Sequence, residues 1–225
     1  MLNRLIAIIS NPFKLGEVSE RKIWIDVAAI SLIIALVAGI LVAPISHRDG
    51  LKIWEKTHPE QVEKLKELGR WDAVVNVSSI ALAIRTGISV SIFYILGLIF
   101  TSLLLFLVMK LFATEINFKD VLFAYAHATF LNYGIGAALR TLIILSKKTI
   151  IGVTTSIALF LPGLSPFSKT YSILQNFDLF DIWTAVAAGL ALAGLAKIEP
   201  KKGVIASLIV WLIKAAVMSL PLLFF

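Results

Sequence analysis

The chain of 225 residues contains no cysteine and only three histidines. The absence of cysteine excludes disulfide bonds, thiolate metal ligands and a cysteine nucleophile. Three histidines are few for a metal centre, and we expect neither a metal ion nor another cofactor. Charge is scarce as well, because 16% of the residues are charged whereas 59% are hydrophobic, with a mean hydropathy of +0.92. This composition lies outside the range of soluble globular domains and indicates a membrane protein.

Sequence motifs of catalysis are missing too. The chain contains no HExxH, no GxSxG and no phosphate-binding loop. Its aspartates and glutamates lie mostly in segments that flank the apolar stretches, so we expect no pair of acidic residues at bilayer depth. The net charge of +7 comes from lysines and arginines spread along the chain, which is typical of residues facing lipid headgroups rather than nucleic acid. We therefore predict a protein that is not an enzyme and that contacts the lipid bilayer but no nucleic acid.

Five apolar stretches are long enough to cross the hydrocarbon layer, about 30 Å thick, as helices. The charged sequence SHRDG is expected to end the first of them. The apolar stretch from Ala73 to Leu111 would be about 58 Å long as a helix, too long for one crossing. We expect an interfacial helix over Ala73 to Ile84, then a bend near Arg85 and Gly87. The predicted spans are Ile23–Ile45, Ile88–Met109, Val121–Leu145, Phe177–Ala196 and Gly203–Phe225.

Two further segments are predicted to be helical without crossing. The amphipathic loop 46–84 contains THPEQVEKLKELGR, in which Pro59 fits a first helical turn and Gly69 a helix end. The apolar run from Ile150 to Leu164 is short for a crossing, so we expect a re-entrant or interfacial helix over 149–165. Lysines and arginines divide equally between the two sides of a five-span arrangement, and a sixth span would place more of them outside than inside, which favours five.

The N-terminal segment 1–22 is predicted to lie in the membrane interface. Leu2, Leu5, Ile6 and Ile9 share one face at helical spacing, and Arg4 and Ser10 lie away from it. Asn11 and Pro12 form its hinge, because proline cannot continue the helix and biases the preceding residue to an extended conformation.

Polar side chains inside the predicted spans are the candidate functional residues, because such groups are costly in hydrocarbon unless they are paired. Lys214 lies about 16 Å along the fifth span and His127 about 13 Å along the third, so the two could share one polar layer. Pairing between Asp26 and Lys214 is one arrangement that the spacing allows. The candidate layer consists of Lys214, His127, Asn132, Asp26 and Arg140. These residues either bind an ion or relay protons, or they only hold the helices in register.

Three stretches resemble the Yip domain family, whose eukaryotic members are called Ypt/Rab-interacting proteins. They are RLIAIISNPFK at the start, INFKDVLFAYAHATF entering the third span and NFDLFDIWTAVAAGLALAGLAKIEPKKG around the fourth. The resemblance implies one all-helical, five-span membrane domain over residues 1–225, in the inner (cytoplasmic) membrane of a cell and with a cytoplasmic N-terminus. The family supplies no catalytic residues.

The likeness is to the prokaryotic branch of that family. Eukaryotic members act in vesicle traffic and associate with small GTPases and with one another. This chain lacks their long N-terminal region and its Asp-Leu-Tyr-Gly-Pro motif, which puts a GTPase partner in doubt. His127 also follows Tyr125-Ala126 where family members often have a proline.

Two functions therefore remain open from the sequence. The first is a non-catalytic membrane protein that organises lipids, membrane-protein partners or further copies of itself. The second is a transporter or channel for an ion or small solute that uses the polar layer. They differ in whether water reaches the middle of the fifth span.

Overall fold

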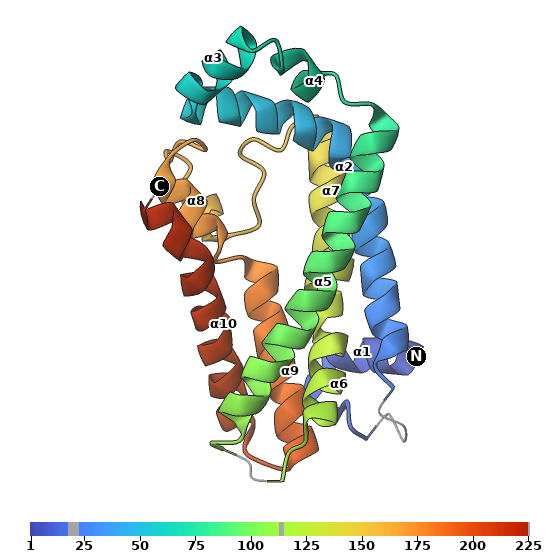
Figure 1. Cartoon of the computed structure of the whole chain (residues 1–225). Helices are drawn as coiled ribbons and strands as arrows, with labels where there is room; N and C mark the ends of the chain where they lie inside the picture. The colour runs from blue at the N-terminus through green and yellow to red at the C-terminus, as the bar shows by residue number, and fades with distance from the viewer. Residues whose placement is uncertain (18–22, 113–114, 225) are drawn as a thin grey trace.

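A computed structural model describes residues 1–17, 23–112 and 115–224 (Figure 1). Within these ranges the chain is helical without a β-strand, and five helical segments are long and apolar enough to cross a membrane. The predicted all-α, multi-pass bundle is thus confirmed. The spanning segments are α2 (Ile25–Thr57), α5 (Ser79–Met109), the continuous run α6 (Phe118–Thr129), η2 (Phe130–Gly136) and α7 (Ala137–Lys147), then α9 (Leu179–Ala196) and α10 (Pro200–Phe224).

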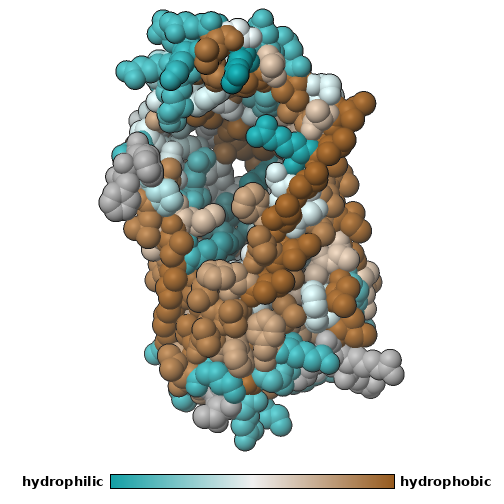
Figure 2. Space-filling view, viewed as in Figure 1, coloured by the Kyte–Doolittle hydropathy of each residue, from teal (hydrophilic) through white to brown (hydrophobic). Residues whose placement is uncertain are grey.

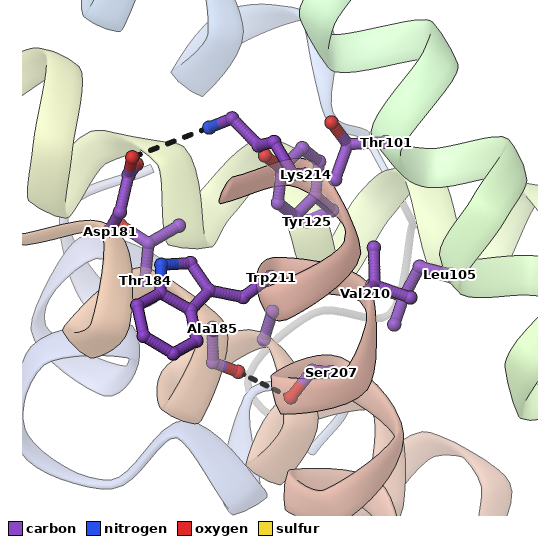
Figure 3. Close-up of a pocket in the computed structure, with 11 residues that line it drawn as sticks. Thr101, Leu105, Tyr125, Asp181, Thr184, Ala185, Ser207, Val210, Trp211 and Lys214 are labelled. Atoms are coloured by element: carbon purple, nitrogen blue, oxygen red, sulfur yellow. Dashed lines mark hydrogen bonds and ion pairs between the residues drawn. The ribbon is translucent and has the colours of Figure 1, made fainter. Parts of the chain in front are cut away.

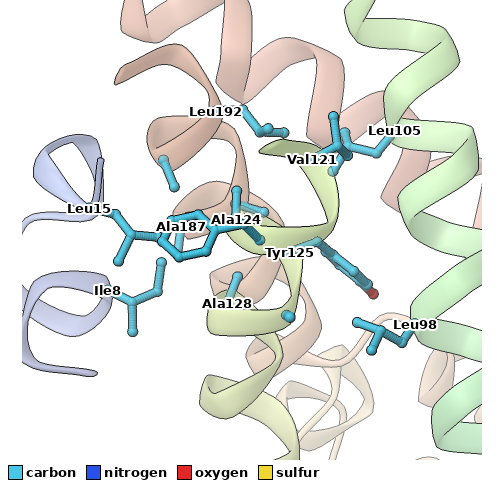
Figure 4. Close-up of a cluster of buried hydrophobic side chains, with 14 of the residues drawn as sticks. Ile8, Leu15, Leu98, Leu105, Val121, Ala124, Tyr125, Ala128, Ala187 and Leu192 are labelled. Atoms are coloured by element: carbon cyan, nitrogen blue, oxygen red, sulfur yellow. The ribbon is translucent and has the colours of Figure 1, made fainter. Parts of the chain in front are cut away.

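Helix α6 lies at the centre of the bundle. All residues from Phe123 to Thr129 are buried, which three alanines in this stretch permit because they let neighbouring helices approach closely. Figure 4 shows Tyr125 of α6 pointing toward Leu98 of α5, and Ala124 facing α9 and the N-terminal segment. The N-terminal helix and helices α2, α5 and α9 pack against this helix.

The N-terminal helix α1 (Leu2–Ser10) has two apolar sides with different neighbours. Leu2, Ile6 and Ile9 are exposed, as predicted for a helix in the interface. The opposite side is not solvated, because Ile8 is completely buried in the core with Leu15 (Figure 4). Helix α1 is therefore docked on the bundle as well as exposed to the membrane interface.

The hinge after α1 forms where the sequence predicts it. Asn11 leaves the helical conformation at φ −152°, and Pro12 begins the short 3₁₀ helix η1 (Pro12–Lys14). Helix η1 lies so close to α9 that a Cβ atom on Gly194 would overlap the Phe13 carbonyl. The end of the predicted segment 1–22, from residue 18, lies outside the described residues.

The helix of the first span does not end at SHRDG, where the charged sequence predicts its end. Helix α2 continues to Thr57 and bends over the end of the bundle opposite the N-terminus, with Pro44 inside it (Figure 1). We call this end the outer end, and the end with the N-terminus the inner end. Proline removes a backbone hydrogen bond and kinks a helix without ending it. The charged sequence therefore lies within α2, and the part of the helix that follows it runs across the end of the bundle (Figure 1). Asp49, in the charged sequence, is buried and paired with Arg48.

The bend expected near Arg85 and Gly87 is also absent. Helix α5 runs without interruption from Ser79, whose N-cap Ser78 accepts a hydrogen bond from the Ala81 amide at 3.2 Å. A single helical glycine costs only about 1 kcal/mol, so Gly87 does not end a helix stabilised by burial. Helix α5 instead crosses the bundle obliquely (Figure 1), and a tilted helix fits more residues into the same thickness. The predicted interfacial helix Ala73 to Ile84 is therefore wrong.

The rest of the loop follows the prediction in part. Helix α3 (Pro59–Glu67) begins with Pro59 and is followed by Gly69 at φ +64°, a conformation that favours glycine. A second short helix, α4 (Trp71–Val75), connects it to α5.

The predicted helix over 149–165 is wrong. Only η3 (Ile157–Phe160) in this segment is helical, as one 3₁₀ turn. Thr149 Oγ1 and the Ile150 amide both donate to Asp49 Oδ2, at 2.6 and 2.9 Å. Because these donors bond to α2, they do not nucleate a helix of their own. After this irregular segment comes the short helix α8 (Lys169–Gln175), which the sequence analysis did not predict.

Helices α9 and α10 pack with their backbones in contact near the inner end of the hairpin. A Cβ atom on Gly189 would lie 2.6 Å from Gly203 O and 2.7 Å from Val204 Cα. Ser207 Oγ donates to Ala185 O at 2.6 Å across the same contact. Small residues allow this approach, and the packing that it brings is what drives helix association in lipid.

The close contact between α9 and α10 predicts that one added methyl group at Gly189 destabilises the protein. We expect Gly189→Ala to lower the free energy of unfolding by about 1 to 3 kcal/mol, because the added methyl has no space and must push the helices apart. Gly97→Ala is the matched control, since an added Cβ there meets nothing within 4 Å. Unfolding by SDS titration of the protein in detergent micelles measures both. Equal midpoints for the two variants would contradict the contact.

Candidate ionic site within the bundle

The five predicted polar residues do not form one layer. They divide between an outer network, which includes Lys214, Asn132 and Arg140, and an inner one, which includes His127 and Asp26. The pairing considered between Asp26 and Lys214 does not occur. Each of these two residues has another partner of opposite charge.

The outer network starts with an ion pair between α9 and α10. Lys214 Nζ lies 3.4 Å from Asp181 Oδ2, and the other oxygen of Asp181 accepts a hydrogen bond of 2.6 Å from Asn132 Nδ2. Asn132 Oδ1 in turn accepts a hydrogen bond of 2.6 Å from Arg140 Nη2. The side-chain amide of Asn132 thus connects a carboxylate to a guanidinium. Its nitrogen donates to the carboxylate of Asp181, and its oxygen accepts from the guanidinium of Arg140.

Arg140 extends the network to the start of α9. Its Nη1 donates to Thr155 Oγ1 at 3.1 Å and lies 3.4 Å from Asp178 Oδ2. Asp178 also caps α9, because its Oδ1 accepts from the Phe180 amide at 2.8 Å. Two bases and two acids are therefore linked through Asn132, and their formal charges cancel.

The network lies deep in the bundle. Asn132, Asp181 and Lys214 are each about 20 Å from the inner end of their own helical segment, by helical rise. Asn132 belongs to η2, the π-helical part of the third span. Short π-helical segments within α-helices are frequent at functional sites. Gly134 and Gly136 also lie within η2.

The charged side chains are not sealed from the surroundings. The exposed fraction is 35% for Lys214, 21% for Asp181, 29% for Arg140 and 17% for Asp178. Figure 2 shows a hollow on this face of the molecule, between α5 and α10 and below the outer part of α2, with hydrophilic atoms inside it. On both sides the hollow is bordered by apolar surface.

A small pocket adjoins the Lys214–Asp181 pair. Residues of α5, α6, α9 and α10 line it, and Figure 3 shows Tyr125, Thr184 and Trp211 around it with the ion pair. The volume open to water is about 20 Å³. A volume of this size holds about one water molecule or one small ion.

The inner network attaches α1 to the bundle. Arg4 forms an ion pair with Asp26 of α2 and donates to Ile23 O, and its Nη1 lies 3.4 Å from His127 Nε2. His127 is fully buried, and its Nδ1 bonds Phe123 O at 2.7 Å, so this nitrogen is the donor. Every member has a partner, which fits a role in holding α1 in place.

Neither acid of the outer network was among the candidate residues. Asp178 and Asp181 lie at the start of the predicted span Phe177–Ala196, but no acidic pair was expected at bilayer depth. The structure corrects this, because both acids pair with bases of spanning segments. The signal in the sequence is DLFD, two acids three residues apart at the start of an apolar helix, which places them on one helical face.

Among the residues that the structure describes, no group of three His, Asp or Glu side chains is arranged to hold a metal ion. Comparisons with protein-family models, with curated proteins and with solved structures found no match to this chain.

The Lys214–Asp181 pair predicts strong coupling between two substitutions. Asp181→Asn leaves Lys214 without its carboxylate, whereas Asp181→Asn with Lys214→Met removes both charges. We expect the double variant to be more stable than the sum of the single effects by about 1 to 3 kcal/mol. A double-mutant cycle by SDS unfolding measures this energy. The exposed pair Glu199 and Lys202 is the control and should show almost no coupling; additive effects at Asp181 and Lys214 would refute the pair.

The inner network predicts that α1 depends on Arg4. We expect Arg4→Ala to loosen α1, because Asp26 loses its charged partner, so that a cysteine replacing the buried Ile8 becomes accessible. Alkylation of Ile8→Cys with and without Arg4→Ala, followed by mass spectrometry, measures this. Lys14→Ala removes the same charge from an exposed position and should leave the cysteine protected. Protection that persists without Arg4 would show that apolar packing alone holds α1.

Proposed function

We propose that the protein is a non-catalytic, multi-pass membrane protein that binds an ion or small polar solute at the Lys214–Asp181–Asn132–Arg140 network and moves it across the membrane. The observation that carries this proposal is the partial exposure of paired charges at bilayer depth. We further propose that it resides in the inner (cytoplasmic) membrane with its N-terminus in the cytoplasm.

Exposure of these charges favours binding over a purely structural role. A structural ion pair in a membrane protein is stabilised by complete burial, since hydrocarbon cannot solvate the parts left open. Lys214 and Asp181 remain partly open at the small pocket (Figure 3). The same face of the molecule has a hollow with hydrophilic atoms inside it (Figure 2). Water or a polar solute at the pocket would provide the missing solvation.

The shape of the third span supports the same proposal. Irregular helical backbone at membrane depth is tolerated where it borders a cavity or is covered by protein, and transporters place their sites at such segments. The π-helix η2 carries Asn132, which joins the two ion pairs.

A second candidate function is the organisation of membrane-protein partners or of further copies of the chain. It is favoured by the surface unit formed by α3 and α4 at the outer end, where Lys66 lies 5.2 Å from the Trp71 ring and pairs with Glu55. The resemblance to the Yip domain family belongs with this candidate and stays a prediction.

Water access to Lys214 tests the proposal directly, because the chain has no native cysteine. We expect Lys214→Cys to react with a membrane-impermeant, charged thiosulfonate in intact vesicles about tenfold faster or more than Ile213→Cys, since only a hydrated thiol ionises. Ile213 is the matched control, because it lies at the same depth on the lipid-exposed side of α10.

The direction of access and the fold are checked in the same experiment. Reagent is added from either side of sealed vesicles, and both variants must elute as the unmodified protein does. Equally slow labelling of both cysteines would show that water does not reach the network, and it would overturn the proposed function.

A further inference from the structure

Two polar side chains in the lining of the pocket beside the ion pair lack a hydrogen-bond partner. Their unpaired atoms are Thr184 Oγ1 and Trp211 Nε1. Thr184 is 4% exposed, so water outside the protein does not reach its hydroxyl. Buried polar groups without partners cost free energy, and each requires an explanation.

The carboxylate that lines the pocket, Asp181, is already engaged on both of its oxygens. One oxygen is bonded to Lys214 and the other to Asn132. Ser207 Oγ donates to Ala185 O, so that carbonyl is occupied as well. In contrast, the indole nitrogen of Trp211 can only donate, and the Lys214 ammonium has three N–H bonds of which one serves Asp181.

This balance selects the charge of an occupant. A cation would lie against the Lys214 ammonium, and the only carboxylate among the lining residues, Asp181, already pairs with that ammonium. An anion would accept from Trp211, Thr184 and Lys214 together, with full satisfaction of the two unpaired donors. The space of about 20 Å³ limits it to a species of one or very few atoms.

We propose that the pocket formed by Thr184, Trp211 and Lys214 binds a small monovalent inorganic anion of the halide class (Figure 3). This inference rests on the proposed function and names the class of solute that the ionic site accepts. A single trapped water molecule could satisfy the same donors, and the test must separate the two occupants.

The fluorescence of Trp211 provides the test. The full chain in detergent micelles carries Trp24→Phe, Trp54→Phe, Trp71→Phe and Trp183→Phe, so that Trp211 is its single tryptophan. Sodium iodide is titrated at constant ionic strength against sodium gluconate, and chloride is then added as a competitor that does not quench. We expect saturable quenching by iodide that chloride reverses.

Two substitutions test the geometry of the site. Thr184→Val keeps the shape and removes the unpaired hydroxyl, and it should raise the apparent iodide dissociation constant about tenfold, the usual effect of losing one hydrogen bond to a charge. Ser102→Ala is the matched control, because it removes a buried hydroxyl that also lacks a hydrogen-bond partner but lies outside the lining of this pocket. It should leave the iodide dissociation constant unchanged.

Linear quenching that chloride does not reverse, or equal affinities of the parent and Thr184→Val proteins, would overturn the anion site and leave water as the occupant. The labelling rates at Lys214→Cys separate this failure from that of the proposed function. A hydrated cysteine without halide binding refutes only the anion, whereas an unreactive cysteine refutes the solute site as a whole.

Discussion

A charged side chain in the hydrocarbon layer must meet an opposite charge or reach water, and the arrangement of this bundle depends on that constraint. Arg4 draws α1 against the bundle because Asp26 lies at the inner end of α2. Lys214 and Arg140 bring the start of α9 toward the third span, since Asp181 and Asp178 are their counter-ions. Apolar packing around α6 supplies most of the contact area, but the ion pairs decide which helix faces meet.

The α9–α10 hairpin combines a closed part and an open part. Toward its inner end, Gly189 and Gly203 bring the two backbones into contact, and no space remains between them. Near Asp181 and Lys214 the same helices border the small pocket. Small residues and charged residues thus divide the hairpin between a tightly packed part and a part that borders a pocket.

Much of the fold could be predicted from the sequence. The spanning helices follow from the length of the apolar runs, and the exposed face of α1 follows from the helical spacing of Leu2, Ile6 and Ile9. Lys214, Asn132 and Arg140 were also found, since polar residues are rare in such runs. Their partners Asp178 and Asp181 were missed because they are next to a loop in the sequence, and only the tertiary structure shows how deep α9 begins. The continuation of α2 past SHRDG was missed for a related reason. Charges end a membrane crossing, but they do not end a helix.

The sealed inner part of the hairpin has an electrical consequence. An aqueous hollow conducts, so the membrane potential would fall chiefly across the packed region between the network and the inner surface, where Gly189 meets Gly203. Moving one elementary charge through 100 mV changes its free energy by about 2.3 kcal/mol. An anion arriving from the outer side would therefore reach Lys214 across little of the voltage, and nearly all the electrical work would belong to its passage through the inner half.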